Sequence, residues 1–193
     1  MLPLINKALS GDTDAFLELM DINQPAMLRI AHGFFSQEED IADAIQDTIL
    51  DAFEHLSSLK EPRYFKTWLI RILINNCNHI YTRNKKYVPI EENTVDFTET
   101  SQKKVASESE VSAHDPDTPL YRFHELLSYI SEENRLCFQL YYGEELSTRE
   151  IADILHIKES TIRSRMHREK LKLKTKLIKD GYIPMYGKEE PLS

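Results

Sequence analysis

Apolar residues recur at intervals of three and four along most of the chain, a spacing that predicts amphipathic helices rather than strands. The first stretch, residues 4–35, is expected to form two helices. The second of these should begin at Pro25, because proline is favoured in the first turn of a helix. Nothing in the stretch indicates chemistry, so we interpret it as scaffold.

The predicted helix at residues 39–56 has an apolar stripe on one side and carboxylates on the other. The stripe comprises Ile41, Ile45, Ile49, Ala52, Phe53 and Leu56. The carboxylates, with Gln46 beside them, are Asp40, Asp43, Asp47, Asp51 and Glu54. Such a face could be solvated, could bind a metal ion, or could dock a basic helix of a partner. A metal site is the least favoured, because no second cluster in the sequence would complete the coordination sphere.

A fourth helix, long and expected at residues 63–83, is apolar almost all round and has a single polar stripe. Its core side comprises Phe65, Trp68, Leu69, Ile72 and Ile80. Its polar stripe comprises Thr67, Arg71, Asn75, Asn78 and Thr82, continued by Lys85. Residues 63–86 contain six Lys/Arg and no acid, so rings in this segment could stack on unpaired bases. The rings are Tyr64, Phe65, Trp68 and Tyr81, and the alternative is that they simply fill the core.

Residues 88–118 lack an apolar stripe and are rich in acids, Ser and Thr, which predicts a flexible linker. Beyond it, a helix is expected from Ser131 to Tyr142, ended by Gly143. We expect an N-terminal domain at residues 1–87, the linker at 88–118, a C-terminal domain at 119–179 and a tail at 180–193.

Residues 147–168 have the pattern of a helix-turn-helix, two short helices separated by a turn at residues 156–158. Ser147 and Glu150 fit a capping box at the start of the first helix. Ile162 and Met166, one turn apart, would pack on that helix. The opposite face has donors and cations but no carboxylate: Ser160, Arg163, Ser164, His167 and Arg168. An arginine can bond a guanine edge through two N–H groups, so this face suits the major groove, although an ordinary helical hairpin would also show a polar face.

Charge is distributed unevenly along the 193 residues. The formal net charge is −8, yet residues 158–179 contain nine Lys/Arg and two Glu. Together with the block at 63–86, this pattern suggests contact with DNA at two places. Cys77 and Cys137 have no neighbouring ligand cluster, so we expect reduced thiols. No apolar run is as long as a membrane span and the N-terminus lacks the features of a signal peptide, so the expected location is the cytoplasm.

In their order and spacing, these segments resemble a bacterial RNA polymerase sigma factor of the extracytoplasmic-function (ECF) group of the sigma-70 family. DAIQDTILDAF (43–53) looks like the acidic segment that binds the clamp helices of the large polymerase subunit. FKTWLIRILINNCNHIYTRNKK (65–86) resembles the helix that melts and reads the downstream promoter element. ELSTREIADILHIKESTIRSRMHREKLKL (145–173) is similar to the domain that reads the upstream element. The resemblance implies an all-α protein of two helical domains joined by a flexible acidic linker, the C-terminal one a helix-turn-helix.

The resemblance also implies the functional residues. Those for polymerase binding are Asp43, Gln46, Asp47 and Asp51. Those for the downstream element are Ser58, Lys60, Tyr64, Arg71, Asn75, Asn78, Arg83 and Lys85. Those for the upstream element are Arg149, Ser160, Thr161, Arg163, Ser164, His167 and Arg168. Expected partners are core RNA polymerase, promoter DNA and an anti-sigma factor, and no catalysis, metal or cofactor is expected.

The helix-turn-helix departs from the family pattern in its turn. His156 stands where glycine is usual, and histidine is among the residues that tolerate positive φ. Lys158 and Glu159 replace the usual small cap and proline. The main alternative function is a free-standing regulator, which would need a dimerisation element for paired half-sites, and no heptad run supplies one. The third candidate function is a nuclease with metal-binding carboxylates at positions 40, 43 and 47, but the sequence offers no second set of ligands for the metal.

Overall fold

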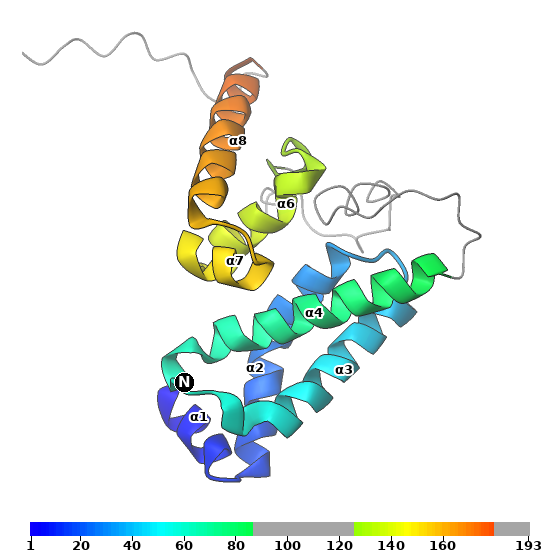
Figure 1. The fold of residues 1–193 in the computed structure, drawn as a ribbon, viewed down its shortest axis with the longest axis vertical. Helices are drawn as coiled ribbons and strands as arrows, with labels where there is room; N and C mark the ends of the chain where they lie inside the picture. The colour runs from blue at the N-terminus through cyan, green and yellow to red at the C-terminus, as the bar shows by residue number, and fades with distance from the viewer. Residues whose placement is uncertain (87–125, 180–193) are drawn as a thin grey trace, which may run out of the picture.

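The computed structural model describes residues 1–86 and 126–179, and every regular element within these ranges is a helix. The prediction of an all-α protein is confirmed. The predicted linker and tail lie outside the described residues. Figure 1 shows the helices in two groups, α1–α4 and α6–α8, with α7 beside α4.

The N-terminal group comprises α1 (Leu2–Leu9), α2 (Thr13–His32), α3 (Glu38–His55) and α4 (Phe65–Lys86), with 3₁₀ turns at Leu56–Ser58 and Pro62–Tyr64. The predicted helix start at Pro25 is wrong, because α2 begins at Thr13 and Pro25 lies in its interior. Asp12 caps this helix, its carboxylate accepting from the Ala15 N–H at 3.0 Å. The turns of α2 before Pro25 bury Phe16 and Leu19, and this burial outweighs the free energy that a proline costs inside a helix.

Helices α2, α3 and α4 enclose an apolar core. Its largest buried side chains include Leu19, Met27, Ile30, Ile41, Phe65, Leu69 and Leu73. Trp68 is half-buried at the edge of this core. Cys77 and Cys137 are both free and buried, as expected. Burial raises the pKa of the Cys77 thiol to about 12, so this side chain is an inert part of the core.

The C-terminal group comprises α6 (Glu132–Phe138), a π-helical turn at Gln139–Gly143, α7 (Thr148–Leu155) and α8 (Glu159–Lys179). The predicted capping box is confirmed: the Glu150 N–H donates to Ser147 Oγ at 3.2 Å, and the Ser147 N–H donates to Glu150 Oε2 at 2.9 Å. His156 has a left-handed conformation with φ 55°, and the predicted three-residue turn joins α7 to α8. Ile162 and Met166 are buried, so the helix-turn-helix is confirmed.

A carboxylate from α8 fixes the start of α6. Glu169 is 3% exposed and accepts from the Ser131 N–H at 3.2 Å, the Ser131 hydroxyl at 3.0 Å and the Asn134 amide at 3.2 Å. Lys172 donates to the same carboxylate at 2.9 Å. Glu169 thus satisfies a backbone N–H at the start of α6 that the helix cannot pair by itself.

Candidate protein and nucleic-acid interfaces

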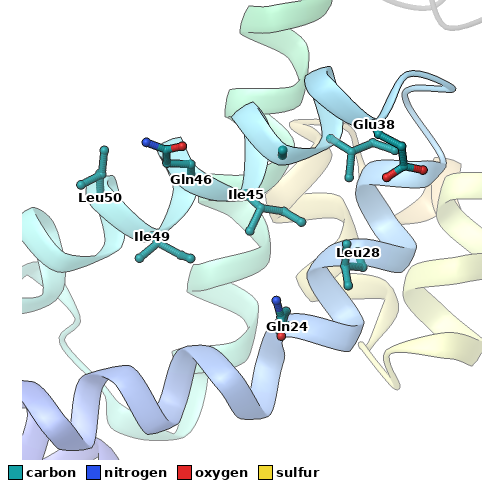
Figure 2. A pocket seen from close by; sticks show the side chains of 9 residues that line it. Gln24, Leu28, Glu38, Ile45, Gln46, Ile49 and Leu50 are labelled. Carbon is teal, nitrogen blue, oxygen red and sulfur yellow. The ribbon is translucent and has the colours of Figure 1, made fainter.

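An open apolar groove of about 380 Å³ lies between α2 and α3. Figure 2 shows Gln24 and Leu28 of α2 on one side of it and Ile45 and Ile49 of α3 on the other. Leu50, at the edge of the groove, is 54% exposed. A groove with a large apolar side chain exposed at its edge suits a protein partner.

Phe53, a member of the predicted apolar stripe, extends the apolar surface of α3. It is 54% exposed, and its ring meets that of Phe16 edge-on with the centroids 5.2 Å apart. The stripe is therefore buried over part of its length and exposed at Phe53. The spacing of apolar residues alone could not distinguish a buried stripe from a half-covered groove.

The predicted carboxylates of α3 do not form one free ridge. Packing of α4 against α3 brings α4 side chains to three of them. The Asn84 amide donates to Asp40 at 2.9 Å, the Asn76 amide donates to Asp51 at 2.9 Å, and Arg83 lies 3.5 Å from Asp43. Asp47 and Glu54 are exposed, and Gln46 is exposed where it lines the groove. Of the predicted polymerase-binding residues, Asp43 and Asp51 therefore face α4, and only Gln46 lies in the groove.

The predicted polar stripe of α4 is exposed over only part of its length. Asn75 and Thr82 are exposed, Asn78 and Arg71 are half-buried, and Arg71 Nε is buried without a hydrogen-bond partner among the described residues. Thr67, by contrast, is 8% exposed and donates to Glu150 Oε1 of α7 at 2.6 Å. The stripe prediction is wrong at Thr67, because the C-terminal helices cover that end of α4.

The remaining predicted downstream-element residues lie at the two ends of α4. Ser58, Lys60 and Tyr64 precede the helix and are exposed. The Arg63 guanidinium lies over the Tyr64 ring at 4.8 Å from its centroid. Arg83 is on the side toward α3, and the side chain of Lys85 is outside the described set. A cation stacked on an exposed ring is a suitable platform for an unpaired base.

The face of α8 opposite its buried side is exposed, as predicted. Its exposed members are Ser160, Arg163, Ser164, His167 and Arg168, while Thr161 is half-buried and Arg149 is exposed on α7. A carboxylate lies at the start of this face. Glu159 Oε1 accepts from Thr148 at 2.8 Å and from Arg163 at 2.6 Å. These hydrogen bonds hold the pKa of Glu159 below its ordinary value, and the one from Thr148 has the larger effect. One N–H group of Arg163 is therefore already engaged.

The described residues offer no metal centre. Within residues 1–86 and 126–179, no three His, Cys, Asp or Glu side chains are grouped closely enough to hold an ion. Asp40 and Asp43 of the nuclease alternative instead contact Asn84 and Arg83. Of the helices in this part of the chain, none is both long and apolar enough to cross a bilayer.

Comparison with known proteins gives consistent matches for both groups of helices. The family models "Sigma-70 region 2" and "Sigma-70, region 4" match residues 19–87 and 120–173. The ECF RNA polymerase sigma factor SigW of Bacillus subtilis is 25% identical over 179 residues, which cover 90% of this chain and 94% of the relative. SigV of the same organism is 23% identical over 152 residues, with 79% and 84% covered. The sigma factor RpoE of Bartonella quintana, solved with the anti-sigma factor NepR, has the same fold, with a TM-score of 0.57, 23% identity and coverage of 86% and 98%.

Proposed function

This chain belongs to the extracytoplasmic-function group of the sigma-70 family, and we propose that it has separate surfaces for polymerase and for promoter DNA. The groove between α2 and α3 would bind polymerase, and α4 and α8 would bind DNA. The protein is an alternative sigma factor, which directs transcription initiation by RNA polymerase. The observation that carries the assignment is the separation of an apolar groove with an acidic edge from two cationic helices, α4 and α8. We assign no catalytic step to the chain and place it in the cytoplasm, where polymerase and promoter DNA meet.

The groove between α2 and α3 is the proposed docking site for the clamp helices of core polymerase. Its apolar floor supplies buried area, and exposed Leu50 and Phe53 extend that area. Glu38 and Gln46 line the groove, and exposed Asp47 follows Gln46 on α3, so these side chains would steer a basic partner. Asp43 and Asp51 contribute less in this proposal, because α4 side chains already bond to them.

Charge reversal at Asp47 tests this assignment. Asp47→Lys should lower the affinity for core polymerase by about tenfold or more, because it replaces an exposed negative charge on α3 with a positive one that would repel a basic partner. Asp153→Lys, an equal change at an exposed position on α7, is the matched control and should leave the affinity unchanged. Reversal of Asp43 is less informative, since its new cation would also repel Arg83. Binding is measured by fluorescence titration, with circular dichroism to verify folding. Equal affinities for the two variants would refute the docking site.

For DNA, we propose that α8 reads the upstream duplex and that α4 binds the melted downstream strand. Arg163→Ala should cost on the order of 1–3 kcal/mol and relax the preference at one or two base pairs. Lys174→Ala, further along α8, should weaken binding to all sequences alike and reduce the salt dependence. Lys172 is unsuitable as this control because it bonds to buried Glu169. Binding is measured against all single substitutions of the upstream element, and a uniform loss for Arg163→Ala would contradict base reading.

An anti-sigma factor is the proposed inhibitory partner. The similar RpoE structure is a complex with such a factor. An inhibitor that covered the groove between α2 and α3 would compete directly with core polymerase for the same apolar surface.

A further inference from the structure

A single buried carboxylate joins the two groups of helices. Glu144, between the π-helical turn and α7, has a side chain with 0% exposure. Its Oε1 accepts from Arg29 Nε at 3.1 Å and from the Arg29 terminal nitrogen at 2.8 Å. Lys66 Nζ lies 3.1 Å from Oε2 and donates to the Glu144 backbone carbonyl at 2.9 Å. Both cations come from the N-terminal group, Arg29 from α2 and Lys66 from α4.

Two further hydrogen bonds cross the same junction. The Gln139 amide donates to the Arg29 carbonyl at 2.6 Å, and the Thr67 hydroxyl donates to Glu150 at 2.6 Å. Gly33 lies beside Gln139, and a Cβ at this position would lie 3.0 Å from the Ile30 carbonyl oxygen and 3.2 Å from the Gln139 amide oxygen. These polar contacts add to apolar packing, because the buried apolar residues of the two groups form one cluster. Polar contacts are common at interfaces between domains that move.

Glu144 is incompletely paired, and its cationic partners are partly exposed, so the two groups of helices can separate at this point. Oε2 has a cation nearby but accepts no hydrogen bond from the described residues, so the cost of removing it from water is only partly offset. The side chains of Arg29 and Lys66 are 31% and 37% exposed and would regain water readily on separation. Glu169, whose carboxylate has four donors within its own group, shows the contrasting, fully paired arrangement.

The closed junction covers the start of the predicted polar stripe of α4, the helix to which we assign melted downstream DNA. Thr67 is buried under Glu150, and Lys66, one of the six cations in residues 63–86, is neutralised by Glu144. We infer that Glu144 is a latch, which holds the helix-turn-helix group against α4 in the free factor and masks the start of the DNA-binding stripe. Single-stranded DNA on α4 and closure of the latch then exclude each other, so each weakens the other by the same factor. The masking rests on the proposed function, whereas the latch itself does not.

The separation of the two groups tests the latch directly. Labels on Asp21→Cys in α2 and Thr175→Cys in α8, both at exposed positions, report the distance between the groups by double electron-electron resonance. The native cysteines are buried and would not compete for label. The test variant is Arg29→Ala in the full chain. The matched control is Lys7→Ala, which also removes one cation outside both basic blocks and is exposed.

Wild type and Lys7→Ala should show one short distance. In Arg29→Ala the open population should rise by about tenfold or more, because the buried carboxylate loses its hydrogen-bonded partner. Glu144→Gln, which keeps the shape and removes the charge, should open to a smaller extent, and circular dichroism should show both variants folded. Affinity for a mixed-sequence single-stranded deoxyoligonucleotide should rise several-fold in Arg29→Ala and stay constant in Lys7→Ala.

Unchanged distances in both Arg29→Ala and Glu144→Gln would overturn the latch. Longer distances without a gain in DNA affinity would overturn the masking of α4. Neither result depends on polymerase, so a failure here is distinguishable from failure of the Asp47→Lys test of the proposed function.

Discussion

The two groups of helices pair their buried polar side chains in different ways. In the N-terminal group, Asn23 and Thr48 each donate to a carbonyl one turn earlier in the same helix, at 2.7 and 2.6 Å. In the C-terminal group the buried polar residues include two carboxylates with partners in other segments of the chain, Glu144 with Arg29 and Glu169 with Ser131. The N-terminal group therefore relies on apolar contacts between helices, and the C-terminal group also relies on directed bonds.

This difference determines what each group tolerates. Apolar packing has no directional requirement, so it responds to lost volume. A buried carboxylate needs its donors in place, so it responds to the loss of one partner or of its own charge. The N-terminal group should therefore lose stability mainly when a buried side chain is shortened, and the C-terminal group also when a buried carboxylate or one of its donors is removed.

The largest effect is expected from a cavity in the N-terminal core. Leu73 on α4 is 0% exposed, and Leu73→Ala should lower the free energy of unfolding by about 2–5 kcal/mol. Leu171→Ala, at a 52% exposed position on α8, is the matched control and should change it by less than about 0.5 kcal/mol. The measurement is urea unfolding followed by Trp68 fluorescence. Similar losses for the two variants would contradict the core assignment.

A smaller but more local effect is expected at Glu169. Glu169→Ala removes the acceptor of the Ser131 N–H and hydroxyl and one of the two acceptors of the Asn134 amide, and should cost about 1–3 kcal/mol, whereas exposed Lys172 can bond to water. The loss should appear as faster amide hydrogen exchange in α6, with unchanged exchange in α2 to α4. Asp153→Ala on the exposed side of α7 is the control and should leave exchange in α6 unaltered. Equal acceleration of exchange in both groups of helices would show that they unfold as one unit and are not stabilised separately.

The sequence predicts elements wherever local pattern and tertiary packing agree. The helices α3 and α4 and the capping box at Ser147 are examples, since the apolar repeat and the Ser147–Glu150 pair each depend on residues within one or two turns. Pro25 is the contrasting case: its local preference for a helix start was overruled by core contacts of the turns before it. The linker prediction for residues 88–118 lies outside the described residues and stays a prediction.

The sequence predicted which polar residues make up the candidate surfaces, but not which of them are exposed and free to bind a partner. The face of α8 is exposed because no other described helix covers it. Thr67, Asp40 and Asp51 have the same polar character, yet Glu150, Asn84 and Asn76 bond to them. Which polar residues are already paired depends on helices distant in sequence. A single chain without its fold cannot supply that information, and the same limit hid Glu144.

Acid should weaken the C-terminal group first. Burial raises the pKa of Glu169, but hydrogen bonds from Lys172 and Ser131 together outweigh burial, so its pKa in the folded protein lies below the ordinary value of 4.5. A lowered pKa means that the stabilisation by Glu169 is complete above pH 4.5 and is lost as the pH falls from there through the folded value. Hydrogen exchange across this range should accelerate in α6 before α2. Glu169→Gln should remove this part of the pH dependence, and an unchanged profile would assign the acid sensitivity to other carboxylates.

The smallest effect is expected at the turn of the helix-turn-helix. His156 is exposed and has φ 55° and ψ 36°, a left-handed conformation that costs a non-glycine residue roughly 1–2 kcal/mol. Glycine adopts it freely but has greater freedom in the unfolded chain, which offsets about 0.4–1 kcal/mol of the gain. His156→Gly should therefore stabilise α7 and α8 by about 0.5 kcal/mol, seen as slower hydrogen exchange in the two helices. Asp153→Gly, three residues earlier inside α7, is the matched control and should cost about 0.3 kcal/mol, because Asp153 is already helical and glycine has a slightly lower helix propensity than aspartate. If His156→Gly also destabilised these helices, the histidine side chain would have to contribute more to the turn than its backbone strain costs.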